Sequence, residues 1–196
     1  MKKLRQTIKD GGEIDAEEIV KFSCRHTNWD NIKYDLDEKI IPFLRSRGAT
    51  KFGTIGTCWG GYNIIRCLIL LISPRKTDIL NKNRYFRMAS YPQCQFSIGF
   101  HSSHWAFLKY YTGDDYIQVF QDITNDVLLL NSNAEPDENR EGGLLEQVIG
   151  PKFYSKDYDQ DHGWVVRGDL EIPAVKVDVE DAVLLALEFA LDRKDL

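Results

Sequence analysis

A cysteine held between glycines, in the sequence GTCWG at residues 56–60, constrains the fold of this chain more than any other feature. It lies between a short β-rich segment, residues 51–57, and an apolar segment, residues 62–72, which we expect to form a strand and a helix. A glycine-flanked nucleophile on a tight strand-to-helix turn is the nucleophile-elbow pattern, here with sulfur in place of oxygen. We expect glycine to be required on both sides of this turn, because a side chain at either place would clash.

Apolar strands and helices alternate along the chain. Beside residues 51–57, the expected strands are 96–100, 127–131 and 152–154, and the expected helices are 15–22, 31–47, 62–72 and 180–191. Pro42 is expected to kink the second helix, Gly48 to end it, and Asp178 or a neighbour to cap the last helix. The sequence VLLLN at 127–131 is continuously apolar and predicts a strand buried on both faces. The alternation is typical of an α/β fold, with a mainly parallel sheet flanked by helices.

The length of 196 residues predicts one domain. Residues 1–14 are polar and basic, so we assign them to a loose N-terminal tail, and we assign residues 15–196 to a single α/β domain. Thirty acidic residues against 25 basic ones give a net charge of −5. This charge argues against a nucleic-acid partner or an anionic membrane, both of which attract a basic surface.

Neither export nor a bound metal is expected from the sequence. The longest apolar run falls well short of the ~20 residues that a membrane-spanning helix needs, and polar residues stand where a secretory signal would be apolar. We therefore expect a cytoplasmic protein with reduced thiols. Its four cysteines contain no CxxC pair, and its four histidines have no zinc-ligand spacing with them, so we expect neither a metal nor another cofactor.

Cys58 is the expected nucleophile. It would lie at the N-terminus of a helix, where the partial positive charge of the helix end favours a thiolate. The backbone N–H of Trp59, which directly follows it, is the expected donor to an oxyanion. The alternative is a buried structural cysteine in a glycine-rich turn.

A cysteine nucleophile needs a base, and the base needs an acid that orients it. On an elbow scaffold these follow in the order nucleophile, acid, histidine. His162 lies in a loop before the last helix, and Glu135 and Asp137 both lie in the loop after the strand at 127–131. The sequence does not choose between the two carboxylates. An ordinary surface histidine and a solvated acidic loop are the alternatives.

Three segments together resemble the dienelactone hydrolase family of the α/β-hydrolase superfamily: GTCWGGY at 56–62, FHSSH at 100–104, and HGW at 162–164 followed by RGD at 167–169. The resemblance covers residues 20–195. It implies an α/β-hydrolase-like fold and a carboxymethylenebutenolidase-like activity, in which a Cys-His-acid triad opens lactones or cleaves small esters without a cofactor.

The resemblance also implies residue roles. Cys58 would be the nucleophile and His162 the base. The aspartate of the family falls on Glu135, and Asp137 could substitute for it. His104 and Trp164 would line the substrate pocket, although packing roles at a strand end and in a loop are the alternative.

Two departures from the family pattern affect these expectations. The strands that precede the elbow in the family, with the loop that supplies a second oxyanion donor, have no counterpart in residues 1–50, and residues 72–90 resemble an insertion. We therefore expect a fold truncated at its N-terminus relative to the family, with an exposed sheet edge that favours self-association. Losing one oxyanion donor costs about 10²–10³ in rate. A catalytically impaired member that acts as a binding or partner-dependent protein is thus the alternative to an active hydrolase.

Overall fold

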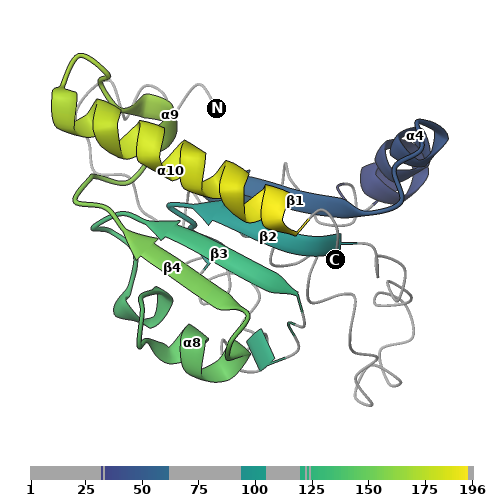
Figure 1. Ribbon diagram of the computed structural model, residues 1–196, viewed down its shortest axis with the longest axis horizontal. Helices are drawn as coiled ribbons and strands as arrows, with labels where there is room; N and C mark the ends of the chain where they lie inside the picture. Colours follow the sequence, from purple (N-terminus) through teal and green to yellow (C-terminus); the bar gives the residue numbers. More distant parts are fainter. Residues whose placement is uncertain are drawn as a thin grey trace, which may run out of the picture.

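The computed structural model describes residues 34–61, 94–104 and 125–193, together with Ile32, Phe120, Gln121 and Ile123. Within this part of the chain a parallel sheet and its helices form an α/β fold (Figure 1). The expected tail at 1–14, the expected helices at 15–22 and 62–72, and the insertion at 72–90 lie outside the described residues.

The sheet contains four described strands, which confirm the four expected ones. They are β1 (Phe52–Thr57), β2 (Cys94–Phe100), β3 (Asp126–Asn131) and β4 (Phe153–Asp157). They lie in the order β1-β2-β3-β4, and every neighbouring pair is parallel. Their carboxyl ends therefore meet at one edge of the sheet, where ligand sites of open α/β sheets usually lie.

The strand β3 is buried on both faces, as its apolar run predicts. Residues 127–130 are at most 3% exposed. Successive side chains of a strand point to opposite faces, so Leu128 and Leu130 share one face with Ile98 and Phe100 of β2. On that face they form the main cluster of the core together with residues of the last helix.

The last helix, α10 (Pro173–Asp192), runs across this face of the sheet (Figure 1). It buries Ala182, Ala186 and Phe189 against the strands. The helix begins earlier than the sequence suggested, so the expected cap at Asp178 is wrong. Pro173 stands in its first turn, where the fixed φ of proline is helical and its missing N–H is not needed. Asp178 instead accepts a hydrogen bond from the side chain of Gln160 at 2.7 Å.

Where a helix is expected at 31–47, the described residues Ile32, Tyr34 and Asp35 are helical, and two consecutive segments follow them, the π-helical η1 (Leu36–Ile40) and α4 (Ile41–Ser46). Pro42 lies in the first turn of α4, so the widened π-helical turn precedes the proline. Gly48 follows with a φ of 89°, the left-handed conformation expected after a helix end.

Three short helical segments follow β3 and β4: η4 (Asp137–Asn139), α8 (Leu144–Ile149) and α9 (Trp164–Arg167). The first two belong to the connection between β3 and β4, and α9 lies between β4 and α10. In the part of the chain that the structure describes, no helix has the length and apolar character to cross a lipid bilayer.

Candidate active site

Cys58 directly follows β1 and has a left-handed backbone, with a φ of 51°. Three backbone hydrogen bonds of 3.0 Å hold it: its N–H donates to the carbonyl of Phe100, and its carbonyl accepts from the N–H groups of Gly61 and Ser103. A left-handed non-glycine residue is strained, and such strain persists only where the surroundings over-determine it. The sharp turn thus places the thiol at the carboxyl edge of the sheet.

The glycines of the turn are required for different reasons than the sequence suggested. A Cβ on Gly56 would lie 2.5 Å from the backbone carbon and oxygen of Gly60, which confirms the expected clash before the nucleophile. A Cβ on Gly60 would meet no described atom within 4 Å, so the described residues do not support the expected clash after the nucleophile. Gly61 is the second position that needs glycine, because a Cβ there would lie 1.9 Å from Oγ of Ser102.

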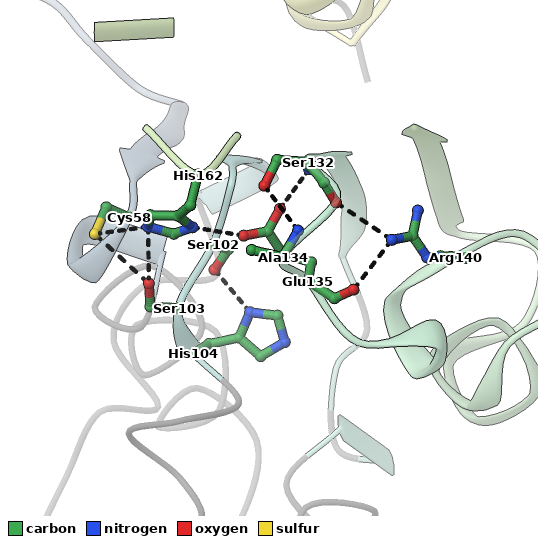
Figure 2. A network of polar contacts seen from close by, with 9 residues as sticks. All are labelled: Cys58, Ser102, Ser103, His104, Ser132, Ala134, Glu135, Arg140 and His162. Carbon is green, nitrogen blue, oxygen red and sulfur yellow. Dashed lines mark hydrogen bonds and ion pairs between the residues drawn. The ribbon is translucent and has the colours of Figure 1, made fainter. Parts of the chain in front are cut away.

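His162 lies between the thiol and a carboxylate, as Figure 2 shows. Its Nε2 is 3.2 Å from Sγ of Cys58, and its Nδ1 is 2.7 Å from Oε1 of Glu135. The three residues follow β1, β3 and β4, and the parallel register of the sheet brings them together. This is the arrangement of nucleophile, base and orienting acid.

Glu135, rather than Asp137, reaches His162. The carboxylate of Glu135 is fully buried, and its second oxygen accepts the backbone N–H of Ser132. The guanidinium of Arg140 donates to the carbonyls of Ser132 at 3.3 Å and of Glu135 at 3.1 Å, which fixes the loop (Figure 2). Asp137 has a fully exposed side chain and pairs with Arg140 at 3.3 Å, so its expected role as the triad acid is not supported.

The electrostatics of the site favour a thiolate–imidazolium pair. The imidazoles of His101 and His162 lower the pKa of the Cys58 thiol to about 5, against the opposing effect of burial. The Cys58 thiolate and then the Glu135 carboxylate raise the pKa of His162 to about 9. Burial works against ionisation of Glu135, but hydrogen bonds from His162 and Ser132 hold its pKa below the ordinary value. Between these two pH values the cysteine is ionised and the histidine protonated.

Ser103 is a polar neighbour of the site that the sequence did not single out for a role. Its Oγ lies 3.5 Å from Sγ of Cys58 and 3.4 Å from Nε2 of His162 (Figure 2). The hydroxyl can therefore donate to the thiolate. Its signal in the sequence was its place just after a strand, where side chains reach the carboxyl edge of a parallel sheet.

His101 is the second residue near the thiol that sequence reasoning missed. It directly follows β2, has a left-handed backbone with a φ of 35°, and is fully buried. Its ring packs edge-on against that of His162, with the centroids 4.8 Å apart. It lies close enough to influence the thiol, yet neither of its ring nitrogens has a hydrogen-bond partner of normal geometry among the described residues.

His104, which was expected to line the substrate pocket, lies in the interior of the protein. His104 is fully buried, and its Nδ1 lies 2.7 Å from Oγ of Ser102 while its ring packs edge-on against Phe120. Burial also lowers the pKa of His104 to about 4. It is therefore a packing residue, and the expectation that it contacts substrate is not supported.

A hollow of about 230 Å³ lies beside His162, lined by residues 160–164, 167–169 and 175. Trp164 forms part of its wall, but the side chain is only 3% exposed and packs on Tyr158 with the ring centroids 4.6 Å apart. Trp164 is thus mainly a core residue. Trp59, the expected oxyanion donor, is the first of the described helical residues 59–61, directly after the nucleophile.

Comparisons with family models, with curated proteins and with solved structures found no match to this chain. The class of protein that the described residues define is an α/β protein with a four-stranded parallel sheet. The geometry of the site and the residue types that compose it therefore carry the evidence for function.

Proposed function

We propose that this protein is a cysteine hydrolase that cleaves a small ester or lactone through a thioester intermediate. One observation carries the proposal: His162 lies between Cys58, 3.2 Å from its Nε2, and Glu135, 2.7 Å from its Nδ1. A nucleophile within reach of a base, with the base held by a third group, is the diagnostic geometry of nucleophilic catalysis. The low pKa of the Cys58 thiol, about 5, supports it because the thiolate is the reactive form.

The reaction begins with attack of the Cys58 thiolate on the carbonyl carbon of the ester. The carbonyl π electrons move to the oxygen, and their return expels the alkoxide, which takes the proton from Nε2 of His162. His162, now neutral, accepts a proton from a water molecule that attacks the thioester. The thiolate leaves, so the thiolate–imidazolium pair is restored and one water has been consumed for each ester cleaved.

Glu135 takes no proton in this scheme. Its buried carboxylate holds Nδ1 of His162, so that Nε2 faces the sulfur, and it stabilises the positive charge on the ring. The backbone N–H of Trp59 is the nearest donor along the chain for the oxyanion that forms at each attack.

The likeness to dienelactone hydrolases supports this reaction class. Cys58, Glu135 and His162 follow one another along the chain in the order nucleophile, acid, histidine, which is the order on the elbow scaffold of α/β-hydrolases. The consecutive parallel strands β1 to β4 suit the part of that fold which carries the triad. We propose a dienelactone-hydrolase-like fold on these grounds, with glutamate in place of the aspartate of the family.

Turnover of p-nitrophenyl acetate by the purified protein tests the proposal. Wild type should release nitrophenolate repeatedly, and Cys58→Ala should not. Cys94→Ala is the matched control, because Cys94 is also a described free cysteine but is buried in β2 away from the triad. Equal rates in wild type and Cys58→Ala, with both proteins folded, would refute the hydrolase.

A partner-dependent binding protein is the second candidate. Among the described strands β1 lies at the edge of the sheet, and Ile55 on this strand is 61% exposed. An edge strand with an exposed apolar side chain is a template for pairing with another chain. This candidate predicts no ester turnover by the isolated protein and a concentration-dependent size in chromatography that Ile55→Lys reduces. A monodisperse monomer at all concentrations would count against it.

A further inference from the structure

Cys58, His101 and His162 converge from the ends of three different segments. Each offers one ligand atom, the sulfur of the cysteine or a ring nitrogen of a histidine, and the three atoms lie within 4.8 Å of one another. Nucleophilic attack requires only two of these residues. The presence of a second imidazole at the thiol therefore needs a reason of its own.

The ring of His101 is the unexplained group. It is fully buried, and although it influences the Cys58 thiol, neither of its nitrogens has a hydrogen-bond partner of normal geometry among the described residues. Leaving a buried polar group without a partner is unfavourable, because the group loses its hydrogen bonds to water. Its backbone is also left-handed, a strained conformation for a residue with a side chain. A strained and polar residue of this kind is expected where the side chain serves a ligand.

We propose that Cys58, His101 and His162 bind a divalent metal ion of the zinc class. One thiolate and two imidazoles are the ligands that such borderline-soft ions prefer, and three protein ligands leave one coordination position open. The three residues have no recognisable ligand spacing in the sequence, because they lie 43 and 61 residues apart and the parallel sheet brings them together.

The distances between the three ligand atoms are close to those around a tetrahedral ion. Ligand atoms about 2.3 Å and 2.1 Å from a tetrahedral ion lie about 3.6 Å from each other. Sγ of Cys58 and Nε2 of His162 are already 3.2 Å apart, and no pair exceeds 4.8 Å. Side-chain movements on the order of 1 Å would therefore complete the coordination.

Glu135 supplies the outer partner that metal-binding histidines usually have. Its carboxylate accepts a hydrogen bond from Nδ1 of His162 at 2.7 Å, which leaves Nε2 directed at the sulfur. A carboxylate that orients a ligating histidine in this way fixes the tautomer and raises the basicity of the ligand. The ion would replace the proton that Sγ and Nε2 share, so binding should release one proton.

Bound metal and ester hydrolysis exclude each other in this arrangement, because both use the sulfur and the same nitrogen. The ion should therefore inhibit any activity of the site. The metal site does not depend on the proposed hydrolase, since ions bind to these side chains whether or not the protein turns over an ester.

Titration of the purified full-length protein with Co²⁺ and then Zn²⁺ tests the proposal. Wild type should show a sulfur-to-cobalt charge-transfer absorption that saturates at one equivalent and disappears when Zn²⁺ displaces the cobalt. Cys58→Ala should lose this absorption, although it keeps the other three cysteines. Cys94→Ala, the matched control, should retain it. A wild-type spectrum without the band, or with the same band in Cys58→Ala, would overturn the site.

His101 distinguishes the metal site from a simple thiol–histidine pair. His101→Asn suits the left-handed backbone, which asparagine tolerates, and should weaken Zn²⁺ binding more than tenfold in competition with a chromophoric chelator. Glu135→Gln should weaken it by about 10–100-fold through the outer contact. If His101→Asn fails to fold, His162→Gln replaces it, because the His162 side chain is partly exposed. Unchanged Zn²⁺ affinity in a folded variant that lacks either imidazole would refute the proposal.

Discussion

The carboxylate of Glu135 holds His162 with one oxygen and the loop backbone with the other. Oε1 lies 2.7 Å from Nδ1 of His162, and Oε2 accepts the N–H of Ser132. Since the carboxylate is fully buried, its orientation is determined by these contacts rather than by solvent. Glu135 therefore fixes both the ring plane of His162 and the direction in which Nε2 points.

Replacing Glu135 should impair turnover far more than replacing Asp137. Glu135→Gln keeps the shape but removes the charge that stabilises the His162 imidazolium, so we expect kcat for p-nitrophenyl acetate to fall by about 10²–10⁴. Asp137→Asn, two residues away on an exposed position, should leave kcat unchanged within about twofold. Equal losses in the two variants would show that Glu135 is not the orienting acid.

The alkylation rate of Cys58 should already be high at mildly acidic pH, because its thiol ionises there. Its pKa of about 5 predicts that alkylation by iodoacetamide reaches half of its maximum near pH 5 and stays high at neutral pH. The proton on His162, with a pKa of about 9, is lost above that value, so kcat/KM for the ester should fall again near pH 9. In the alkylation experiment, peptide mass spectrometry measures the modification of each cysteine separately. Burial raises the pKa of Cys94, which should stay unmodified as an internal control. A half-maximum for Cys58 near pH 9 would contradict the ion pair.

The strands, and the loops that carry Cys58, Glu135 and His162, could be predicted from the sequence because they depend on local pattern. Continuous or alternating apolar runs bounded by glycine and polar residues gave all four strands of the described sheet. Cys58 and His162 both lie next to glycine residues, which predicts that each lies in a turn or loop. The start of α10 was missed because Pro173 begins the helix before its apolar pattern does.

The carboxylate that contacts His162 and the placement of His101 beside Cys58 could not be predicted, because both depend on tertiary contacts. Glu135 and Asp137 lie two residues apart in one polar loop, and only the hydrogen bonds of Arg140 and Ser132 determine which carboxylate turns inward. His101 carried a usable signal, its place directly after a strand. The signal does not show that His101 lies beside Cys58. That proximity results from the pairing of β2 with β1, which a long stretch of intervening sequence separates.

The two glycines of the elbow should differ sharply when each is replaced by alanine. Gly56→Ala places a Cβ 2.5 Å from the backbone of Gly60, and backbone atoms cannot rotate away, so we expect a loss of about 1–3 kcal/mol in the free energy of unfolding. Gly60→Ala meets no described atom within 4 Å and removes a glycine from a helical stretch, which should change stability by at most about 1 kcal/mol and favour the fold. Urea denaturation measures both. Equal destabilisation would contradict the close approach at Gly56.

Arg140 should act on turnover through the loop that carries Glu135. Its guanidinium donates to the carbonyls of Ser132 and Glu135 and pairs with Asp157 at 3.0 Å. Arg140→Ala removes these contacts, so we expect a loss of about 1–3 kcal/mol in stability.

A lower kcat at unchanged KM should accompany this loss, because Arg140 lies on the side of Glu135 away from Cys58 and contacts the loop backbone (Figure 2). The readout that separates positioning from stability alone is the pH profile. A carboxylate that no longer holds Nδ1 raises the pKa of His162 less, so the fall of kcat/KM near pH 9 should move to lower pH, which a merely destabilised variant would not show. Arg140→Lys keeps the charge but loses the planar fork of donors, so it should recover only part of the shift. A pH profile identical to wild type in Arg140→Ala, measured well below its melting temperature, would show that the guanidinium does not position the acid.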